Sequence, residues 1–597
     1  MFEFLQKILK PNLGDGDVKP PRVQTPRTEA MCTPADPVAC DSLKKQGNAF
    51  LAQGQLEAAA VCYRQAGEAD PSDVFARINL GFVLFEQGQL VQAQATLRQA
   101  LRLDPNQHDA HFMLGGLAQK QGDTSQAIVH FEEVLKINPH FELAYRELGY
   151  ELFRNKQTEA SERVMLDGID RFPDSADLLC NLGSLYSVEN LPAKAVPIYE
   201  KALVLQPDSA EIVGNLGAAY DALGDGVKAG QLMLRAIELA PGNADLHSNL
   251  GTHLWENGMY RDALQRFNTS VDIDPNHGLG HMHVGLSNLL IGDYEKGWLE
   301  YEWRFKGAGH LASDLQARKS FPQARWLGAE SIDGKTVLLH CEQGYGDTLQ
   351  FCRYAPEVAA RGAVVVLQVQ RGLKELLKSL PGVASVVEEG ETLPAFDMHC
   401  PLMSLPLALG HHKIGITPMK TPYLQAEPER VQYWRQRLAA MGSPQIGVVW
   451  SGNPRNARDH RRSMTFSTFA EMLLPGMPVV VLQPELRAAD LPAAHADSRL
   501  IFPGAELKTF ADTAALVTAL DLVITVCTSV AHLAGALGKP VWVLVSHVPD
   551  WRWQLEGDDS PWYSGAKIFR QAAIHDWSRP VEDVRKALLQ RYPASLG

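Results

Sequence analysis

The sequence predicts an all-α superhelix of stacked helix pairs, followed by an α/β region built from two lobes. Three observations lead to this prediction. Proline and glycine recur at a fixed interval of 34 residues over the first half of the chain. After Phe321, short apolar runs alternate with helical patterns, which is typical of parallel sheets. The stretch Asp521–Leu544 contains one complete strand, turn, helix and strand.

The overall composition is that of a folded protein with several domains. The 597 residues are too many for a single hydrophobic core. Apolar residues make up 45% of the chain and charged residues 21%, which is ordinary for a globular protein. The net charge of −13 comes without a basic stretch, so we expect no nucleic-acid partner.

The cysteines and the apolar runs indicate where the protein resides. The eight cysteines form no CxxC pair and are too sparse for a disulfide scaffold, which favours a reducing compartment. No run of about 18 apolar residues occurs, so we expect no transmembrane segment. The first ten residues, MFEFLQKILK, are too short and too polar for a secretory signal. We therefore predict a cytoplasmic protein.

Residues 1–39 predict a flexible N-terminal tail, because they are rich in Pro, Asp, Lys and Thr and show no periodic pattern. From about residue 40 the chain repeats. The repeated prolines are Pro71, Pro105, Pro139, Pro173, Pro207, Pro241 and Pro275. The repeated glycines are Gly47, Gly81, Gly115, Gly149, Gly183, Gly217, Gly251 and Gly285.

This 34-residue period resembles the tetratricopeptide repeat, in which each unit is a pair of antiparallel helices. A large apolar residue tends to follow 16 residues after the glycine, as Tyr63 follows Gly47 and Phe131 follows Gly115. The glycine allows the two helices of a unit to approach, and the large side chain fills the seam. One pair cannot bury its own apolar face, so the units must stack. We predict seven full units and a divergent eighth within residues 40–306.

Asparagine recurs two residues before the repeat glycine in three successive units, at Asn181, Asn215 and Asn249. An amide offers donors and an acceptor, so a row of asparagines can bind an extended peptide backbone of any sequence. The inner groove of O-linked N-acetylglucosamine transferases is similar. We predict that these residues bind an acceptor protein. The alternative is kinship between neighbouring repeats without a binding role.

The eighth unit departs from the pattern with an aromatic cluster that includes Trp298, Tyr301 and Trp303. We expect this cluster to end the repeats and pack onto the next domain, with stacking on a sugar as the alternative. Residues 307–325 are predicted to be a connector.

Two sets of alternating strands and helices follow the connector. The first set predicts a Rossmann-like lobe over residues 326–425, with strands at 336–341, 364–369 and 383–387. The second set predicts a Rossmann-like lobe over residues 426–597, with strands at 446–450, 479–482, 522–526 and 541–545. Two such lobes facing each other across a cleft form the layout of one large class of glycosyltransferases.

The turn after the predicted strand 522–526 opens a helix, and the free N–H groups at the start of a helix attract anions. Crevices at the carboxyl ends of parallel strands are also where ligands bind in open α/β sheets. The sequence therefore predicts an anion site at this turn, with an ordinary strand–helix unit that binds nothing as the alternative.

Four segments of the second half resemble bacterial repeat-containing glycosyltransferases whose catalytic half is similar to the heptosyltransferases of glycosyltransferase family 9. The segments are CEQGYGDTLQFCRY, GVVWSGNPRNARDHRRSM, ADTAALVTALDLVITVCTSVAHLAGALGKPVWVLV and VPDWRWQLEGDDSPWYSGAKIFRQ. With the repeats, the resemblance covers about residues 40–580. It implies a GT-B fold of two Rossmann-like lobes and an inverting transferase that uses a nucleotide-sugar donor and needs no metal or other cofactor. Some relatives of this architecture glycosylate flagellin in the cytoplasm.

The resemblance implies that Asp347, in the turn Gly344-Tyr345-Gly346-Asp347, is the general base. A hydroxyl is a poor nucleophile, and a carboxylate that takes its proton typically accelerates such reactions about 10²–10⁴-fold. Gly344 and Gly346 would let the backbone approach the donor. The alternative is that Asp347 only caps the following helix.

Without a metal, the charge of the leaving phosphate must be met by arginine, hydroxyl and backbone N–H donors. The candidates lie in the loop after residue 450 and in the turn after residue 526. They are Ser451, Asn453, Arg461, Arg462, Ser463, Thr528, Ser529 and His532. A solvated charged loop, and simple packing of His532, are the alternatives.

One residue departs from the pattern of the relatives. They usually carry Asp-Thr-Ser at the second turn, and this chain carries Cys527-Thr528-Ser529. The missing carboxylate leaves three hypotheses open. The chain transfers a sugar to Ser or Thr of an acceptor protein such as flagellin, or it is an inactive repeat scaffold that binds protein partners, or it is a transferase for a glycan acceptor.

Overall fold

A computed structural model describes residues 35–306, 321–413, 415, 421–454 and 459–593. The chain divides into two compact units, Met1–Leu185 and Tyr186–Gly597, and each is described by itself. Most of the predicted tail 1–39, and residues 307–320 of the predicted connector, lie outside the described residues.

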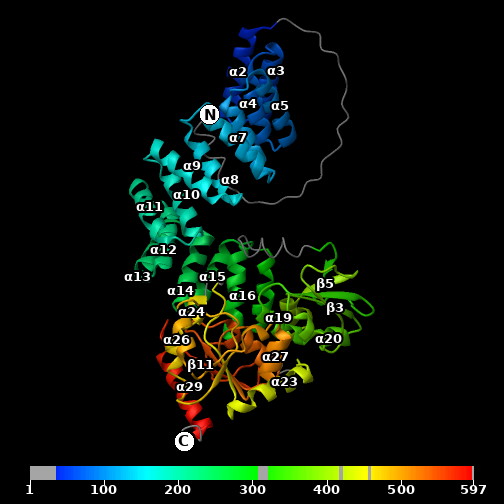
Figure 1. Ribbon diagram of the computed structural model, residues 1–597. Helices are drawn as coiled ribbons and strands as arrows, with labels where there is room; N and C mark the ends of the chain where they lie inside the picture. Colours follow the sequence, from blue (N-terminus) through cyan, green and yellow to red (C-terminus); the bar gives the residue numbers. More distant parts are fainter. Residues whose placement is uncertain (1–34, 307–320, 414, 416–420, 455–458, 594–597) are drawn as a thin grey trace. The chain divides into compact units, whose positions relative to one another are not determined.

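The first unit is built from antiparallel helix pairs (Figure 1). Its helices are α2 (Pro37–Ala52), α3 (Leu56–Ala69), α4 (Val74–Glu86), α5 (Leu90–Leu103), α6 (His108–Lys120), α7 (Thr124–Ile137), α8 (Glu142–Arg154), α9 (Thr158–Arg171) and most of α10 (Ala176–Val188). This is the predicted repeat, since each second helix ends two residues before a repeat proline.

The repeat glycines lie where the sequence predicts a close approach. A Cβ atom on Gly115 would lie 2.5 Å from Cε1 of Phe131, the large residue 16 positions later. The same holds for Gly47, whose Cβ atom would lie 2.6 Å from Cε1 of Tyr63. Any side chain at these glycines would push the two helices of the unit apart, which confirms the predicted seam.

The second unit continues the helix pairs and then changes to α/β structure. Its remaining repeat helices are α11 (Pro192–Leu205), α12 (Ala210–Leu223), α13 (Gly226–Leu239), α14 (Ala244–Glu256), α15 (Tyr260–Ile273), α16 (Gly278–Ile291) and α17 (Tyr294–Tyr301), followed by the 3₁₀ turn η1 (Glu302–Phe305).

A five-stranded parallel sheet follows the repeats, with strand order β1-β5-β2-β3-β4. Its strands are β1 (Ala324–Arg325), β2 (Thr336–His340), β3 (Val364–Val369), β4 (Val383–Glu388) and β5 (Met398–Pro401). Its helical elements are α19 (Tyr345–Phe351), η2 (Cys352–Tyr354), α20 (Ala355–Ala360), α21 (Lys374–Leu377), η3 (Leu402–Ser404), α22 (Leu405–Ala408) and η4 (His411–Lys413).

A six-stranded parallel sheet forms the last part, with order β11-β10-β9-β6-β7-β8. Its strands are β6 (Ile446–Val449), β7 (Val479–Val481), β8 (Leu500–Ile501), β9 (Leu522–Val526), β10 (Val541–Val545) and β11 (Ala566–Arg570). Its helical elements are α23 (Pro428–Leu438), η5 (Ala439–Met441), α24 (Asp459–Arg462), α25 (Phe466–Ala470), α26 (Leu491–Ala496), η6 (Gly504–Glu506), α27 (Phe510–Ala519), α28 (Ser529–Ala536), η7 (Trp551–Trp553) and α29 (Ser578–Arg591).

Apolar residues bury both faces of the second sheet, as the β-branched runs predict. Val523 and Val543 face a core shared with α27 and α28. Ile524 and Leu544 face a separate core to which Val584 of the closing helix α29 contributes. The closing helix α29 therefore packs on the second sheet, beside β11.

The aromatic cluster of the eighth unit joins the repeats to the sheets, as predicted. Trp298 is buried and packs edge-on against Phe351 of α19 and Trp551 of η7, with ring centroids 5.7 Å and 5.3 Å apart. Trp298 and Tyr301 belong to the same core as β2 and β3. Burial of these rings favours packing over sugar stacking.

Candidate functional site

Each sheet has a point where its strand order reverses, and ligand crevices in open α/β sheets form there. In the first sheet this point lies between β5 and β2, and the residues that follow β2 form the turn around Gly344. In the second sheet it lies between β6 and β9, which lead to Ser451 and Thr528. The predicted site residues of both lobes thus follow strands at the two reversal points.

The two turns are in contact with each other. A Cβ atom on Gly346 would lie 2.8 Å from Cδ2 of His532 and 3.6 Å from Cα of Ser529. Gly346 belongs to α19, and the other two residues belong to the first turns of α28. A side chain at this position would therefore collide with His532 unless one of the two turns shifts.

Asp347 lies on this contact, with its carboxylate held on both sides. Its Oδ2 accepts a hydrogen bond from the backbone N–H of Gly344, 2.7 Å away. Its Oδ1 accepts a short hydrogen bond from Nη2 of Arg552 in η7. Asp347 therefore does cap its helix, as the alternative proposes, and it also binds a buried arginine that follows β10 of the second sheet.

Opposing effects act on the carboxyl group of Asp347. Burial raises its pKa, and the Arg552 guanidinium offsets only part of that rise. Its side chain keeps 19% of its surface exposed. A carboxylate of raised pKa that remains accessible is a stronger base than an ordinary surface aspartate.

A buried ion-pair network fixes the first turn from the side of the repeats. Arg304 of η1 donates from Nε and Nη2 to the two carboxylate oxygens of Glu342, at 2.9 Å each. It also donates to Glu302 and to Ser404 at 2.8 Å. Since Glu342 precedes Gly344 by two residues, the eighth repeat unit holds the backbone that carries Asp347.

At the second turn, His532 is buried and uncharged. Burial, with Arg552 nearby, lowers its pKa to about 3. Its Nδ1 lies 3.0 Å from the hydroxyl of Tyr563, and its ring stacks on Trp553 with centroids 5.5 Å apart. Thr528 is the extended residue before α28, and its Oγ1 lies 3.1 Å from Oγ1 of Thr525.

Cys527 directly follows β9 and precedes Thr528 at the start of α28. Its Sγ accepts a hydrogen bond from the indole N–H of Trp553 at 3.0 Å. Burial raises the pKa of the thiol to about 11. The group is therefore a neutral thiol at physiological pH, which argues against a nucleophilic role.

The basic segment after β6 of the second sheet contacts the same turn through Arg462. Its Nη1 donates to the carbonyl oxygen of Cys527 at 3.1 Å, and its Nε donates to Asp459 at 3.0 Å. Ser463 accepts from the backbone N–H of Gly452 at 2.8 Å and donates to Asp459 at 3.0 Å.

The other predicted donor-binding residues of this loop lie in different surroundings. Arg461 donates to Glu256 at the end of α14, 2.8 Å away, so it is held by the repeats. Ser451 is buried and accepts from Nε2 of Gln483 at 3.2 Å. Asn453 is exposed.

The three predicted acceptor-binding asparagines are partly exposed at the same place in successive first helices. Asn215 lies on α12 and Asn249 on α14, both in the second unit. Asn181 lies on α10 within the first unit.

Arg552 also belongs to the site, because it binds Asp347, although the sequence alone does not predict this. It follows β10 in the segment PDWRW, at the carboxyl end of a strand, which was the available signal. Trp551 and Trp553 on either side of it are buried, so they contribute to packing.

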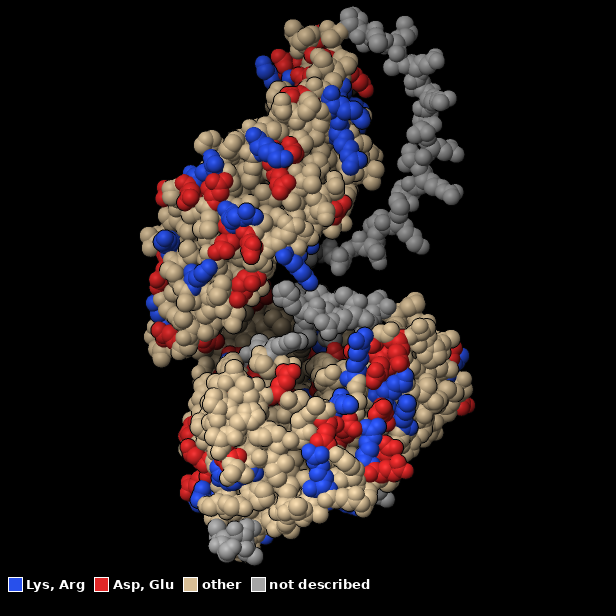
Figure 2. Space-filling view, in the orientation of Figure 1, with Lys and Arg blue, Asp and Glu red and all other residues tan. Residues whose placement is uncertain are grey.

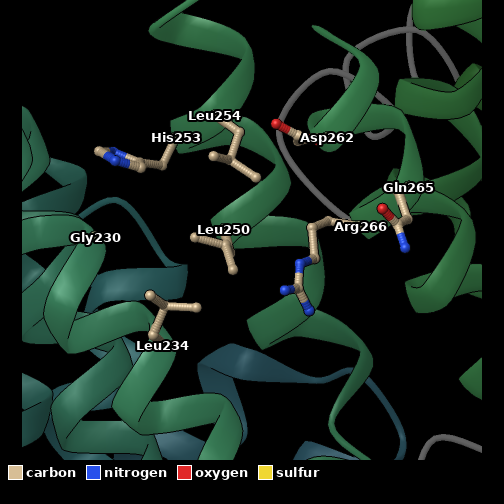
Figure 3. Close-up of a pocket in the computed structure, with 8 residues that line it drawn as sticks. All are labelled: Gly230, Leu234, Leu250, His253, Leu254, Asp262, Gln265 and Arg266. Atoms are coloured by element: carbon tan, nitrogen blue, oxygen red, sulfur yellow. The ribbon is translucent and has the colours of Figure 1, made fainter. Parts of the chain in front are cut away.

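The second unit also has a surface hollow of about 270 Å³ between α13, α14 and α15 (Figure 3). Leu234, Leu250 and Leu254 give it apolar walls, and Arg266 points toward it from α15. It is smaller than most ligand pockets, which occupy roughly 300–1,000 Å³.

On the face shown in Figure 2, basic and acidic side chains are interspersed. Neither sign of charge gathers into a large patch on that face. Among the residues that the structure describes, no helix is long and apolar enough to cross a membrane. Within the same residues, no group of three or more His, Cys, Asp or Glu side chains is arranged to hold a metal ion.

Comparisons with known families establish that the chain carries tetratricopeptide repeats. The family described as "TPR repeat" matches residues 47–88 and 83–122. Families described as "Tetratricopeptide repeat" match residues 108–141 and 180–244. These matches agree with the 34-residue period and with the observed helix pairs.

Protein FlbA of Caulobacter vibrioides is 28% identical over 324 residues, which are 50% of this chain and 53% of that protein. The chain thus spans about half the length of this curated relative. Among solved structures, a tetratricopeptide repeat protein from Parabacteroides merdae has 16% identity and a TM-score of 0.36, over 42% of this chain and 99% of that one. A thermophilic repeat protein of Thermus thermophilus has 23% identity and a TM-score of 0.26, over 30% of this chain and 99% of that one.

Proposed function

We propose that this chain is an inverting, metal-independent glycosyltransferase with a GT-B catalytic half. It would move a sugar from a nucleotide-sugar donor to Ser or Thr of an acceptor protein held by the repeats, in the cytoplasm. The contact between the turn of Asp347 and the start of α28 is the observation that supports this proposal most strongly. The turn proposed to carry the base and the turn proposed to bind the phosphate are in contact, and each follows the strand-order reversal of its own sheet.

The proposed reaction follows from these positions. The carboxylate of Asp347 takes the proton of the acceptor hydroxyl, and the hydroxyl oxygen attacks the anomeric carbon of the donor. The bond between that carbon and the phosphate oxygen breaks, and the nucleoside phosphate leaves with the bonding electrons. Attack from the face opposite the phosphate inverts the configuration of the anomeric carbon.

The leaving phosphate needs positive charge, since the proposal involves no metal. The first N–H groups of α28 supply partial positive charge, at about half an elementary charge for a helix end. Arg462 lies beside this turn because it donates to the carbonyl of Cys527. Arg461 is a less direct candidate, because Glu256 already binds its guanidinium.

The repeats support the acceptor half of the proposal. Tetratricopeptide repeats form extended binding surfaces for proteins. Asn215 and Asn249 lie at equivalent positions on α12 and α14, where successive amides can contact a peptide backbone. Flagellin is the first acceptor to test, because relatives of this architecture glycosylate it.

Cys527 supports a second candidate, an inactive scaffold that binds protein partners. Its neutral thiol cannot replace the charge of the carboxylate that relatives carry. A scaffold would need only the repeats to bind its partners and would show no enzymatic turnover. A transferase would also need both predicted lobes to bind the donor and transfer the sugar.

The first test is thermal unfolding with UDP, GDP, CMP and ADP, each added separately at high concentration. A ligand at about 100 times its dissociation constant stabilises a protein by roughly 2.7 kcal/mol. The transferase hypothesis expects one nucleotide to raise the midpoint, and Arg462→Ala to abolish the rise. Arg461→Ala should reduce the rise less than Arg462→Ala does. No rise with any nucleotide would favour the scaffold.

A further inference from the structure

The side chain of Arg552 is only 6% exposed, yet it is charged and binds three groups. Its Nη2 donates to Oδ1 of Asp347, and its Nη1 donates to Oδ1 and Oδ2 of Asp550 at 2.9 Å and 3.1 Å. Its Nε donates to Oε1 of Gln350 at 2.6 Å. A buried guanidinium is stable only when its donors are satisfied in this way.

The partners show what this arrangement holds in place. Asp347 and Gln350 lie three residues apart on α19, so they share one face of that helix. Asp550 lies two residues before Arg552 and also accepts its backbone N–H at 3.0 Å. Asp550 thus fixes the guanidinium locally, and the guanidinium holds the face of α19 that carries Asp347.

Resting on the transferase function proposed above, we propose that Arg552 is a positioning residue for the base Asp347. It orients the Asp347 carboxylate through the ion pair at Oδ1, while Gly344 fixes Oδ2 from its backbone N–H. The two bonds set the plane of the carboxylate. The exposed part of Asp347 is then directed to the acceptor hydroxyl.

Arg552 also determines the electrostatic environment of the Asp347 carboxyl group. Asp550, which precedes η7, lies close to both residues, and the neutral His532 of α28 and Tyr301 of α17 lie near Arg552. Burial alone would raise the pKa of Asp550, but Arg552 holds it below its ordinary value. Loss of Arg552 would remove the positive charge that Asp347 and Asp550 share, and the nearby Asp550 would remain, so the pKa of Asp347 would rise further.

A purely structural role is the competing explanation, because Arg552 also joins the two lobes. Arg353 provides a matched control for that role. It is equally buried and joins the lobes by donating to Tyr423 at 3.0 Å and to the carbonyl of Trp562 at 3.2 Å. None of its described hydrogen bonds reaches Asp347.

The main experiment compares Arg552→Met, Arg552→Lys and Arg353→Lys. The assay is hydrolysis of UDP-, GDP-, CMP- and ADP-sugars, in which water replaces the acceptor protein. We expect Arg552→Met to keep the nucleotide-induced rise in melting midpoint and to lose about 10²-fold in kcat, as for a misplaced catalytic group. The acid limb of its pH–rate profile should move up by about 1–3 pH units, the effect of removing an opposite charge.

Arg552→Lys should leave the acid limb in place, because it keeps the positive charge, and should recover part of the rate. Arg353→Lys should change neither the limb nor kcat. The proposal would be overturned if Arg552→Met left both the acid limb of the pH–rate profile and kcat unchanged. It would also be overturned if Arg353→Lys lost as much kcat as Arg552→Met. Absence of hydrolysis by the unaltered protein would instead contradict the proposed function.

A second measurement decides the positioning role without turnover. The melting midpoint is followed from about pH 5 to pH 8 for Arg552→Met and for Arg552→Met with Asp347→Asn. In the single variant the folded state holds a proton on the half-buried Asp347 and must lose it as the pH rises, so its midpoint should fall across this range. The double variant should lose that fall, and equal pH dependence in both variants would refute the link between the two residues.

Discussion

Gly346→Ala tests the contact between the two turns most simply, because it adds one methyl group. The new Cβ would lie 2.8 Å from Cδ2 of His532, closer than side chains tolerate. His532 cannot give way easily, since it is buried between Trp553 and Tyr563. Overpacking of this kind costs about 1–3 kcal/mol. For a unit of this size, the melting midpoint should fall by about 1–3 °C.

Gly344→Ala is the matched control, in the same turn. Its Cβ would meet only Oδ2 of Asp347, at an ordinary distance of 3.4 Å, and its backbone φ of −76° suits alanine. We expect a change within about 0.5 kcal/mol. Both variants are compared by calorimetry, and His532→Ala should relieve part of the loss in Gly346→Ala. Equal stability of Gly344→Ala and Gly346→Ala would refute the contact between α19 and α28.

Three further predictions concern the repeats, the thiol and the histidine. Gly115→Ala should destabilise the first unit by about 1–3 kcal/mol, because its Cβ would meet Phe131. Gly116→Ala is the control, because its Cβ would meet nothing within 4 Å, and it should stabilise α6 by up to about 1 kcal/mol. Both free energies are measured by urea unfolding. Cys527 should resist iodoacetamide in the native protein at pH 8, since its thiol pKa is about 11, and rapid labelling detected by mass spectrometry would contradict this. His532 has a pKa lowered to about 3, so the unfolded chain binds the extra proton below about pH 6.5. Stability should therefore fall as the pH drops from about 6 to 4, at up to about 1.4 kcal/mol per pH unit, and His532→Gln should lessen that slope.

The sequence predicts the parts of the fold that depend on local periodicity. The 34-residue interval defines the helix pairs, and the β-branched runs define strands such as Leu522–Val526 and Val541–Val545, which the structure shows with the same bounds. The strand Met398–Pro401 escapes prediction because it is short, ends in proline and contains histidine and cysteine. Its place beside β2 is set by the sheet and not by its own pattern.

The site is predictable where residues follow a strand in sequence, as Asp347 and Ser529 do. The partners of those residues are not, because Arg552 lies 205 positions from Asp347 and Glu256 lies 205 positions from Arg461. Only folding brings such groups together. The role of Arg304 likewise depends on burial beside Glu342, which local patterns do not reveal.

The central claim is that Asp347 activates an acceptor at the contact between the two lobes. Its most direct test measures nucleotide release from UDP-, GDP-, CMP- and ADP-sugars by the full chain and by Asp347→Asn. The account predicts turnover of one donor class by the unaltered chain and a loss of about 10²–10⁴-fold in Asp347→Asn, with the nucleotide-induced rise in melting midpoint unchanged. Equal turnover by both proteins, or none by either, would contradict it.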